Sequence, residues 1–376
     1  MKKVLILGGG VGGTIVANVL ARKVSPSEAN ITLVDATGKH TYQPGFIYVA
    51  FSDAKPENLV RNERSLLDKH INLIIDEAIL IESNERRVRL KSGRILEYDY
   101  LVVATGARLC PEELPGFKAA HHFYDLDASI RLRRALDNFP GGRVVIGIGG
   151  IPYKCPPAPA EAACQLDYYF TRRGSRHKAE IHYLSPLPRV FPLESVAPLV
   201  QEIMESKNIQ YIQLFNVERI EPEKGLVHSL EGESLKHDLL IVVPPHKGAK
   251  VIEDSGLGDK GGWIPTDKYT LRVKGYDDIY AIGDATDIPI SKAGATAHYE
   301  AKIVAENIAA EIKGSGMIKR YDGKVRCFCD AGFKKGITMV FDYEHPPKPT
   351  RLSRKWYYAK MLVGKLYWSL VLKGWA

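Results

Sequence analysis

Short aliphatic runs, each followed by a glycine-rich turn or a polar stretch, predict an α/β protein. Residues 4–7 and 144–148 are continuous apolar runs of the length of buried strands, and residues 31–34 are a similar run with one threonine. Residues 14–23 follow the first run with apolar positions at helical spacing. A strand, a turn and a helix in this order begin a βαβ unit, so we expect parallel sheets with helices on their faces.

The turn after the first run has the spacing G-x-G-x-x-G. Glycines at these positions let the backbone approach a pyrophosphate, and the N-terminus of the following helix attracts its negative charge. The run at 31–34 leads into an aspartate, about twenty residues beyond the turn, where a carboxylate binds ribose hydroxyls. The sequence therefore predicts a bound adenine dinucleotide, held by Gly8, Gly10, Val11, Gly12, Gly13 and Asp35.

A second turn of this kind, after the run at 144–148, lacks two of the expected features. Pro152 occupies the place of the third glycine, where it removes a backbone donor and prevents close helix–strand packing. The next strand, at 179–184, ends at Ser185 where a ribose-binding acid is expected. Both changes argue against a nicotinamide dinucleotide at this turn. The turn instead carries Cys155, in a loop that neighbouring prolines stiffen.

Composition narrows the class of protein. A chain of 376 residues with 45% hydrophobic residues has ample material for two or three domains. The net charge of +8 suits an anionic membrane or a small anion, and the absence of a binding motif argues against nucleic acid. Five scattered cysteines make neither a secreted disulfide scaffold nor a metal site. The first strand follows Met1 almost directly, so we expect no cleaved signal peptide, and no run is long enough to span a bilayer.

Two later strand ends carry a resemblance to a known class. Residues 99–106 end in Ala104-Thr105-Gly106, and residues 279–284 end in Gly283-Asp284. Together with the first glycine turn, they resemble the pattern of the flavoproteins that have two dinucleotide-binding domains. The resemblance implies FAD as the cofactor, with Asp284 at its ribityl or pyrophosphate region.

Four further stretches are similar to the sulfide:quinone oxidoreductases and to the flavoprotein subunit of flavocytochrome c sulfide dehydrogenase. They are residues 42–46, 154–161, 292–294 and 326–332, which read YQPGF, KCPPAPAE, KAG and RCFCDAG. The segment at 40–46 has no cysteine, which separates the chain from the two-cysteine disulfide reductases. The resemblance implies that Cys155 and Cys327 meet on one side of the flavin ring, with Cys327 facing the flavin and Cys155 carrying sulfur.

The resemblance also implies roles for other residues, each with a plain structural alternative. Glu161 is either a proton acceptor or an ordinary carboxylate at a helix N-terminus. Cys329 shares a face with Cys327 if the segment is a strand and competes with it for the same role. The implied FAD-binding residues beyond the first turn are Gln43, Pro44, Ala78, Ala104, Thr105, Gly106, Gly283, Asp284, Lys292 and Gly294. We expect a quinone site on the flavin face away from the cysteines, lined by Phe328 and Phe341.

The chain is expected to divide into an FAD-binding domain (1–107 and 246–314), a second Rossmann-like domain (108–245) and a C-terminal region (315–376). Within the last region, residues 351–375 mix aromatic and basic residues. At 3.6 residues per turn, Arg354, Lys355, Lys365 and Lys373 fall on one arc of the expected helix, and Lys360 does not fit. This composition indicates either a helix lying in a membrane interface or one packed on the protein.

These observations together predict an FAD-dependent sulfide:quinone oxidoreductase that is a peripheral, monotopic membrane protein. Sulfide and polysulfide are its expected substrate and product, a membrane quinone its acceptor, and a homo-oligomer is possible. The alternatives are a soluble sulfide dehydrogenase flavoprotein that donates electrons to a cytochrome, and a type 2 NADH:quinone oxidoreductase.

Overall fold

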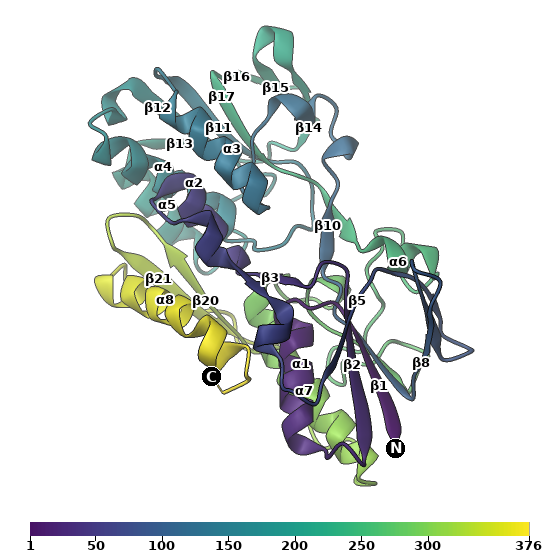
Figure 1. The fold of residues 1–376 in the computed structure, drawn as a ribbon. Helices are drawn as coiled ribbons and strands as arrows, with labels where there is room; N and C mark the ends of the chain where they lie inside the picture. The colour runs from purple at the N-terminus through teal and green to yellow at the C-terminus, as the bar shows by residue number, and fades with distance from the viewer. Residues whose placement is uncertain (376) are drawn as a thin grey trace.

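The computed structural model describes residues 1–375 and contains two parallel sheets, one above the other in Figure 1. The first sheet has the order β19-β9-β1-β2-β5 and is parallel throughout. Its strands are β1 (Lys2–Leu7), β2 (Ala29–Asp35), β5 (Asn72–Ile75), β9 (Tyr100–Val103) and β19 (Ile279–Ala281). The expected α/β architecture is confirmed.

Side chains alternate between the two faces of this sheet, and each face is covered by different helices or strands. Val4 and Ile6 of β1 lie in one apolar cluster with α1 (Val11–Lys23) and α7 (Gly294–Ile312), which run side by side. Leu5 and Leu7 lie in another, against α6 (Lys250–Asp254) and an antiparallel sheet. The strands of that sheet are β6 (Ala78–Glu82), β7 (Arg87–Leu90) and β8 (Ile95–Glu97).

The second parallel sheet has the order β13-β12-β11-β17 and is buried in the same way. Helices cover one face and an antiparallel sheet covers the other. Successive residues of β11 point to opposite faces and therefore belong to different apolar clusters. The strands are β11 (Gly142–Ile148), β12 (Ala179–Leu184), β13 (Ile209–Ile212) and β17 (Leu239–Val243); the helices are α3 (Leu126–Asp137), α4 (Ala158–Arg172) and α5 (Ala197–Ser206); the covering strands are β14 (Val217–Glu221), β15 (Leu226–Ser229) and β16 (Ser234–Lys236).

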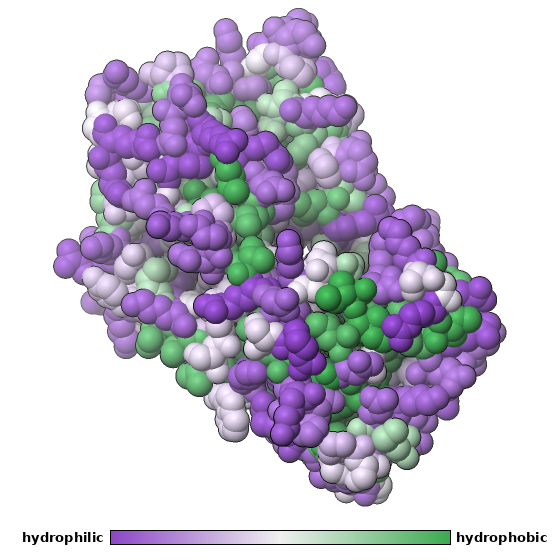
Figure 2. Space-filling model, viewed as in Figure 1, coloured by the Kyte–Doolittle hydropathy of each residue, from purple (hydrophilic) through white to green (hydrophobic). Residues whose placement is uncertain are grey.

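Two antiparallel connectors, β10 (Ala107–Leu109) and β18 (His246–Gly248), pair with each other where the chain passes between the two parallel sheets. Two further strands, β3 (Lys39–Thr41) and β4 (Val60–Asn62), flank the short helix α2 (Phe46–Phe51) in the sequence. In Figure 2 hydrophilic residues cover most of the visible face, and hydrophobic residues gather along the junction between the upper and lower parts.

The C-terminal part is a hairpin followed by a helix. Strands β20 (Val325–Asp330) and β21 (Gly336–Phe341) pair antiparallel, and α8 (Arg354–Leu366) packs against both. A single π-helical turn, Tyr367–Val371, continues α8. The expected C-terminal region runs to Ala376, which lies outside the described residues. Within residues 1–375, no helix combines the length and the apolarity needed to cross a bilayer.

Candidate active site

The first glycine turn has the geometry of a dinucleotide cradle. Gly8 adopts φ +102°, and a Cβ on it would lie 2.5 Å from the carbonyl oxygen of Ala104, so only glycine fits. A Cβ on Gly10 would meet nothing within 4 Å, so the turn opens outward where α1 begins. Asp35 ends β2 beside the turn and accepts hydrogen bonds from the backbone amides of Gly9 (2.9 Å) and Gly38 (2.7 Å). The predicted residues are therefore brought together.

Buried polar atoms without partners mark the region where the cofactor would bind. Within residues 1–375, the hydroxyl of Thr105 and Oδ1 of Asp284 have no hydrogen-bond partner although both are buried. Such atoms cost stability unless a ligand satisfies them, and an FAD ribityl chain and pyrophosphate carry matching groups. Burial raises the pKa of Asp284, and the charges of Lys154 and Lys292 oppose this. The residues present therefore fit FAD.

Lys292 lies inside this region and not on the surface. Its Nζ donates to the carbonyl oxygens of Asp284 (3.2 Å) and Thr286 (2.5 Å), and it lies 3.8 Å from the ring centroid of Trp263. Burial lowers the pKa of Lys292 to about 8, while Asp284 acts in the opposite direction. Lys292 therefore adds a positive charge beside Asp284 at neutral pH.

Four further residues predicted to bind FAD lie in short turns or at the start of a helix, whereas Ala78 lies in a strand of an antiparallel sheet. Gln43, in a 3₁₀ turn with Pro44, accepts a hydrogen bond from Lys154 Nζ at 3.0 Å, which joins that turn to the cysteine loop. Gly283 precedes Asp284 in another 3₁₀ turn, and Gly294 begins α7. Ala78 differs, because it begins β6 opposite Leu90 in the antiparallel sheet, with nothing that marks a ligand site.

Cys155 lies in a fixed loop at the N-terminus of α4. Its backbone has φ +53°, in the left-handed region that non-glycine residues rarely adopt. Its amide donates to the carbonyl oxygen of Lys292 at 2.6 Å, and its carbonyl accepts from Ala158 at 2.9 Å. These two bonds hold the strained residue in place. The loop therefore fixes Cys155 next to the Asp284–Lys292 region.

Cys327 and Cys329 lie on one face of β20, as expected for a strand. Cys329 is buried in the core, whereas Cys327 is partly exposed at its edge. Burial raises the pKa of Cys327 to about 12, and the charge of Cys155 adds to the shift. The charges that act on Cys329 come instead from Glu161, Lys360, Cys164 and Asp330. Of the two thiols on β20, Cys327 is the one coupled to Cys155.

Glu161 and Lys360 form a buried ion pair beside the cysteines. Lys360 Nζ, on α8, donates to Oε1 of Glu161 on α4, and both side chains are almost fully buried. Burial raises the pKa of Glu161, and Lys360 opposes this. Burial also raises the pKa of Cys155 to about 12, although the residue has an exposed side; Glu161 adds to the shift and Lys360 opposes it. The two charges of the ion pair therefore act on the Cys155 thiol in opposite directions.

This ion pair explains why Lys360 does not fit the arc of basic residues predicted for the tail. Its side chain points inward, with Nζ 5.4 Å from the ring centroid of Tyr48, whose hydroxyl donates to Asp330 at 3.0 Å. Its partner Glu161 lies 199 positions earlier in the sequence. Sequence reasoning missed Lys360, and its exclusion from the arc was the only signal of its role.

The two phenylalanines predicted to line a quinone site lie on opposite faces of the hairpin. Phe341 pairs with Val325, so it shares the face of Cys327 and is buried in the core. This position differs from the expectation that it lies away from the cysteines. Phe328 alternates to the other face of β20 and is half-buried.

The second glycine turn is rebuilt, as the sequence indicates. The hydroxyl of Ser185 donates to the carbonyl oxygen of Arg189 at 2.6 Å, within its own loop. The loop after β12 buries Val190 and Phe191 in the core cluster that also holds Tyr153. Apolar side chains therefore pack beside the carboxyl end of β12, the region where a nicotinamide dinucleotide usually binds.

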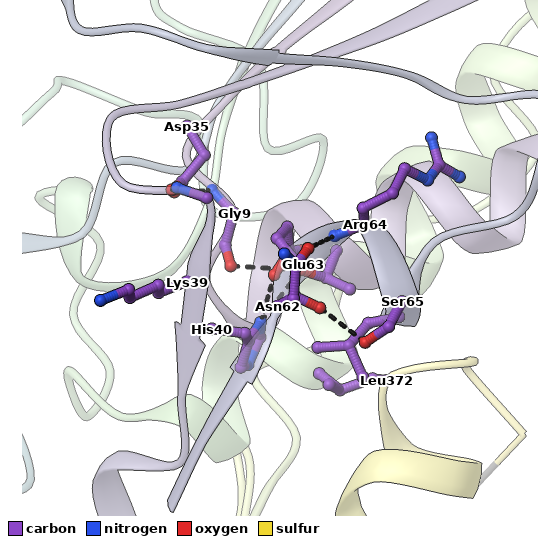
Figure 3. A network of polar contacts seen from close by, with 12 residues as sticks. Gly9, Asp35, Lys39, His40, Asn62, Glu63, Arg64, Ser65 and Leu372 are labelled. Atoms are coloured by element: carbon purple, nitrogen blue, oxygen red, sulfur yellow. Dashed lines mark hydrogen bonds and ion pairs between the residues drawn. The ribbon is translucent and has the colours of Figure 1, made fainter.

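A buried polar network ties the first glycine turn to the C-terminal segment (Figure 3). Thr14 donates to Glu63 at 2.6 Å, and Glu63 lies 2.9 Å from Nδ1 of His40. Because the carboxylate accepts, Nδ1 carries the hydrogen, and Nε2 lies 2.7 Å from the hydroxyl of Tyr367. Asn18 adds a bond to the carbonyl oxygen of Leu372 at 2.9 Å. The network was not predicted from the sequence.

Replacing Tyr367 with phenylalanine is expected to lower the free energy of unfolding by about 1–3 kcal/mol, because Nε2 of buried His40 loses its partner. Urea denaturation measures the change. Tyr358→Phe is the matched control, since Tyr358 is 56% exposed on α8. Equal stability of the two variants would contradict an anchoring role for the network.

The tail has one side that packs on the protein and one side that is exposed. Tyr367 and Leu372 are buried against the first sheet's helices, so this part packs on the protein. The opposite side of α8 and the following turn exposes Tyr358, Leu362, Val363 and Leu370, with Arg354, Lys355 and Lys365 also exposed. The exposed face is therefore both apolar and basic.

Comparison with known proteins agrees with this geometry. Over 99% of its length, the chain is 28% identical to the mitochondrial sulfide:quinone oxidoreductase of Mus musculus, covering 86% of that protein, and 27% identical to the sulfide-quinone reductase of Aquifex aeolicus, covering 92%. The crystal structure of the sulfide:quinone oxidoreductase from A. aeolicus superposes with a TM-score of 0.89 at 24% identity, covering all of this chain and 92% of that one. Residues 2–303 match the family of pyridine nucleotide-disulphide oxidoreductases, and the chain belongs to this family.

Proposed function

We propose that the protein is an FAD-dependent sulfide:quinone oxidoreductase that uses Cys155 and Cys327 as its redox pair. The observation that carries the proposal is the placement of the two thiols. Cys155 precedes α4, Cys327 lies on β20, which packs against α4, and the buried Glu161–Lys360 ion pair joins α4 to α8. The relatives named above, which match over nearly the whole chain, support the same activity.

The proposed cofactor site belongs to residues 1–107 and 246–314, with 108–245 as the second Rossmann-like domain and 315–376 as the C-terminal region. The glycine turn and Asp35 would hold the adenosine half of FAD, and Thr105 and Asp284 would pair with polar groups of its ribityl and pyrophosphate part. Bound FAD supplies a two-electron acceptor that reoxidises the cysteine pair and passes the electrons to a quinone.

The sulfur step needs only the cysteine pair and hydrosulfide. Hydrosulfide attacks the Cys155 sulfur of a Cys155–Cys327 disulfide. The sulfur–sulfur bond of the disulfide breaks, a new one forms on Cys155 as a persulfide, and the electron pair leaves on Cys327 as a thiolate. Sulfide is oxidised by two electrons, and the disulfide is reduced by two. Two-electron oxidation of the persulfide and the Cys327 thiolate re-forms a sulfur bridge, which the next hydrosulfide opens, so that the chain on Cys155 grows by one sulfur. Attack of the Cys327 thiolate on the Cys155 sulfur then closes the disulfide and releases the chain as hydropolysulfide.

Glu161 and Lys360 are suited to controlling the protons of this step. The raised pKa of Glu161 makes it a stronger proton acceptor than an exposed carboxylate. The ammonium of Lys360 favours the thiolate forms of Cys155 and Cys327, because it lowers the pKa of both thiols against the effect of burial.

Steady-state assays with sulfide and decylubiquinone test the proposal. Purified protein loaded with FAD is expected to reduce the quinone only when sulfide is present. A rate with NADH that exceeds the rate with sulfide would instead support a type 2 NADH:quinone oxidoreductase. The loop that packs Val190 and Phe191 beside β12 argues against that alternative.

The membrane proposal rests on the exposed face of α8, which mixes apolar and basic residues as interfacial helices do. Binding through this face provides a route by which a lipid quinone enters near Phe328, and it counts against a soluble dehydrogenase that serves a cytochrome.

The double variant Leu362→Glu with Val363→Glu is expected to reduce co-sedimentation with vesicles of phosphatidylglycerol and phosphatidylcholine by at least about tenfold, because two charges replace apolar area that the lipid would bury. Leu230→Glu, at a site 69% exposed in another part of the chain, is the control. Equal vesicle binding by the double variant and by Leu230→Glu would contradict docking of the protein on a membrane through α8.

A further inference from the structure

Tyr124 and His246 form a buried aromatic pair. Tyr124 precedes α3, and His246 begins the connector β18. Their rings meet edge to face, with centroids 5.3 Å apart and planes at 76°. Their side chains are 4% and 6% exposed. Neither residue was singled out as a site residue from the sequence, and the sulfur step above uses neither.

Each member of the pair has one polar atom without a hydrogen-bond partner among residues 1–375. These atoms are the hydroxyl of Tyr124 and Nε2 of His246. Nδ1 of His246 lies 2.7 Å from the carbonyl oxygen of Pro244, so Nδ1 carries the hydrogen and Nε2 of the neutral ring is an acceptor. Burial lowers the pKa of His246 to about 3, and Lys154 adds to the shift, so the ring is neutral at physiological pH. The pair therefore offers one donor and one acceptor.

The pair lies close to the Cys155 loop. Tyr124 belongs to the same buried apolar cluster as Tyr153, and a Cβ on Gly150 would lie 3.5 Å from Pro245, the residue before His246. Burial raises the pKa of Tyr124 well above its usual value, and the charge of Cys155 is the next contribution. Lys154, whose charge acts on His246, directly precedes Cys155 and donates to Gln43 at 3.0 Å. The Glu161–Lys360 pair acts on both Cys155 and Cys327. The two unpartnered atoms and the reactive loop therefore share one environment.

We propose that Tyr124 and His246 form the subsite that binds hydrosulfide, or the terminal sulfur of the persulfide, next to Cys155; this inference rests on the proposed function. Hydrosulfide is an anionic acceptor that carries one S–H donor. The hydroxyl of Tyr124 donates to its sulfur, and Nε2 of His246 accepts from its S–H. Lys154 adds a favourable positive charge. The pair positions the sulfur and takes no part in electron transfer.

The chemistry explains why these atoms remain unpaired in the protein. A buried polar atom without a partner costs about 1–3 kcal/mol, so two such atoms on adjacent rings are unusual unless a ligand uses them. An apolar substrate would leave both atoms unsatisfied, whereas hydrosulfide satisfies both. A contact to the flavin is the competing explanation, and the test separates the two.

The test compares three variants of the FAD-loaded protein. Tyr124→Phe removes only the unpaired hydroxyl, and His246→Leu removes the acceptor. His246→Gln places an amide oxygen near the position of Nε2. We expect Tyr124→Phe and His246→Leu to lower kcat/KM for sulfide by at least about tenfold through KM, because each loses a hydrogen bond to a charged sulfur. KM for quinone is expected to be unchanged, and His246→Gln to recover most of the loss.

Two controls separate function from folding. Tyr98→Phe removes another buried hydroxyl that lacks a hydrogen-bond partner, in the apolar cluster of the first sheet, and is expected to leave sulfide kinetics unchanged. The thermal midpoint of Tyr124→Phe is expected to equal or exceed that of the original protein, because an unpaired buried hydroxyl is lost.

Two results would overturn the inference alone, with the original protein active on sulfide. The first is a kcat/KM for sulfide within threefold of the original in both Tyr124→Phe and His246→Leu. The second is a weaker FAD affinity or a shifted flavin absorbance in these variants with an unchanged KM for sulfide, which would assign the pair to the cofactor. An original protein that is inactive with sulfide would overturn the proposed function together with the inference.

Discussion

Replacing either Cys155 or Cys327 with serine is expected to lower the rate of sulfide-driven quinone reduction by more than about 1000-fold. A hydroxyl neither forms a disulfide nor leaves as a stable anion, so the persulfide step has no alternative route. The rate is measured with decylubiquinone in FAD-loaded protein, and FAD content is checked for each variant.

Two other cysteines provide matched controls for this prediction. Cys110→Ala changes a buried thiol at the connector β10, outside the candidate site, and is expected to retain activity. Cys329→Ala tests the second thiol of β20 and is expected to retain activity within about tenfold, because the charge of Cys155 acts on Cys327. Loss of activity in Cys329→Ala with activity retained in Cys327→Ser would reverse the assignment.

Replacing Lys360 with methionine is expected to have the second largest effect. The ammonium of Lys360 lowers the pKa of Cys155 and Cys327, so its loss raises both values further. Each unit of increase reduces the thiolate fraction at neutral pH about tenfold. Activity at pH 7 is therefore expected to fall by about 10–100-fold and to recover partly as the pH rises. The pH dependence of Cys155 alkylation by iodoacetamide is expected to shift upward in parallel.

Stability separates the electrostatic effect from misfolding. Lys360→Met leaves Glu161 buried without its partner, which costs about 3–5 kcal/mol when a buried pair is broken. The double variant Lys360→Met with Glu161→Gln removes both charges and is expected to recover most of this stability without recovering activity at pH 7. Lys365→Met, on the exposed side of α8, is the control. An unchanged alkylation profile in Lys360→Met would contradict the electrostatic role.

Much of the fold follows from local pattern in the sequence. The strand at 179–184 and the helix that follows the first glycine turn occur as expected, because aliphatic runs and glycine turns act over a few residues. The rebuilt second turn was also recognisable, since Pro152 and Ser185 replace residue types that a dinucleotide needs. The motifs around Cys155 and Cys327 led, through resemblance, to the redox pair that we propose.

The parts that sequence reasoning missed depend on contacts between distant segments. Lys360 meets Glu161 across 199 positions, and Tyr367 meets His40 across 327. Helical periodicity predicts which side of a helix is polar, but it does not reveal a partner from another part of the chain. Phe341 shows the related limit within a hairpin, because its face depends on the register with Val325.

Anaerobic titration of the flavin tests the central claim most directly. Sulfide added to FAD-loaded protein without quinone is expected to bleach the flavin absorbance band, and an equal amount of NADH to leave it unchanged. The claim requires that Cys155→Ser and Cys327→Ser abolish the bleaching by sulfide. Rapid bleaching by NADH, or bleaching by sulfide that survives loss of either cysteine, would contradict the account.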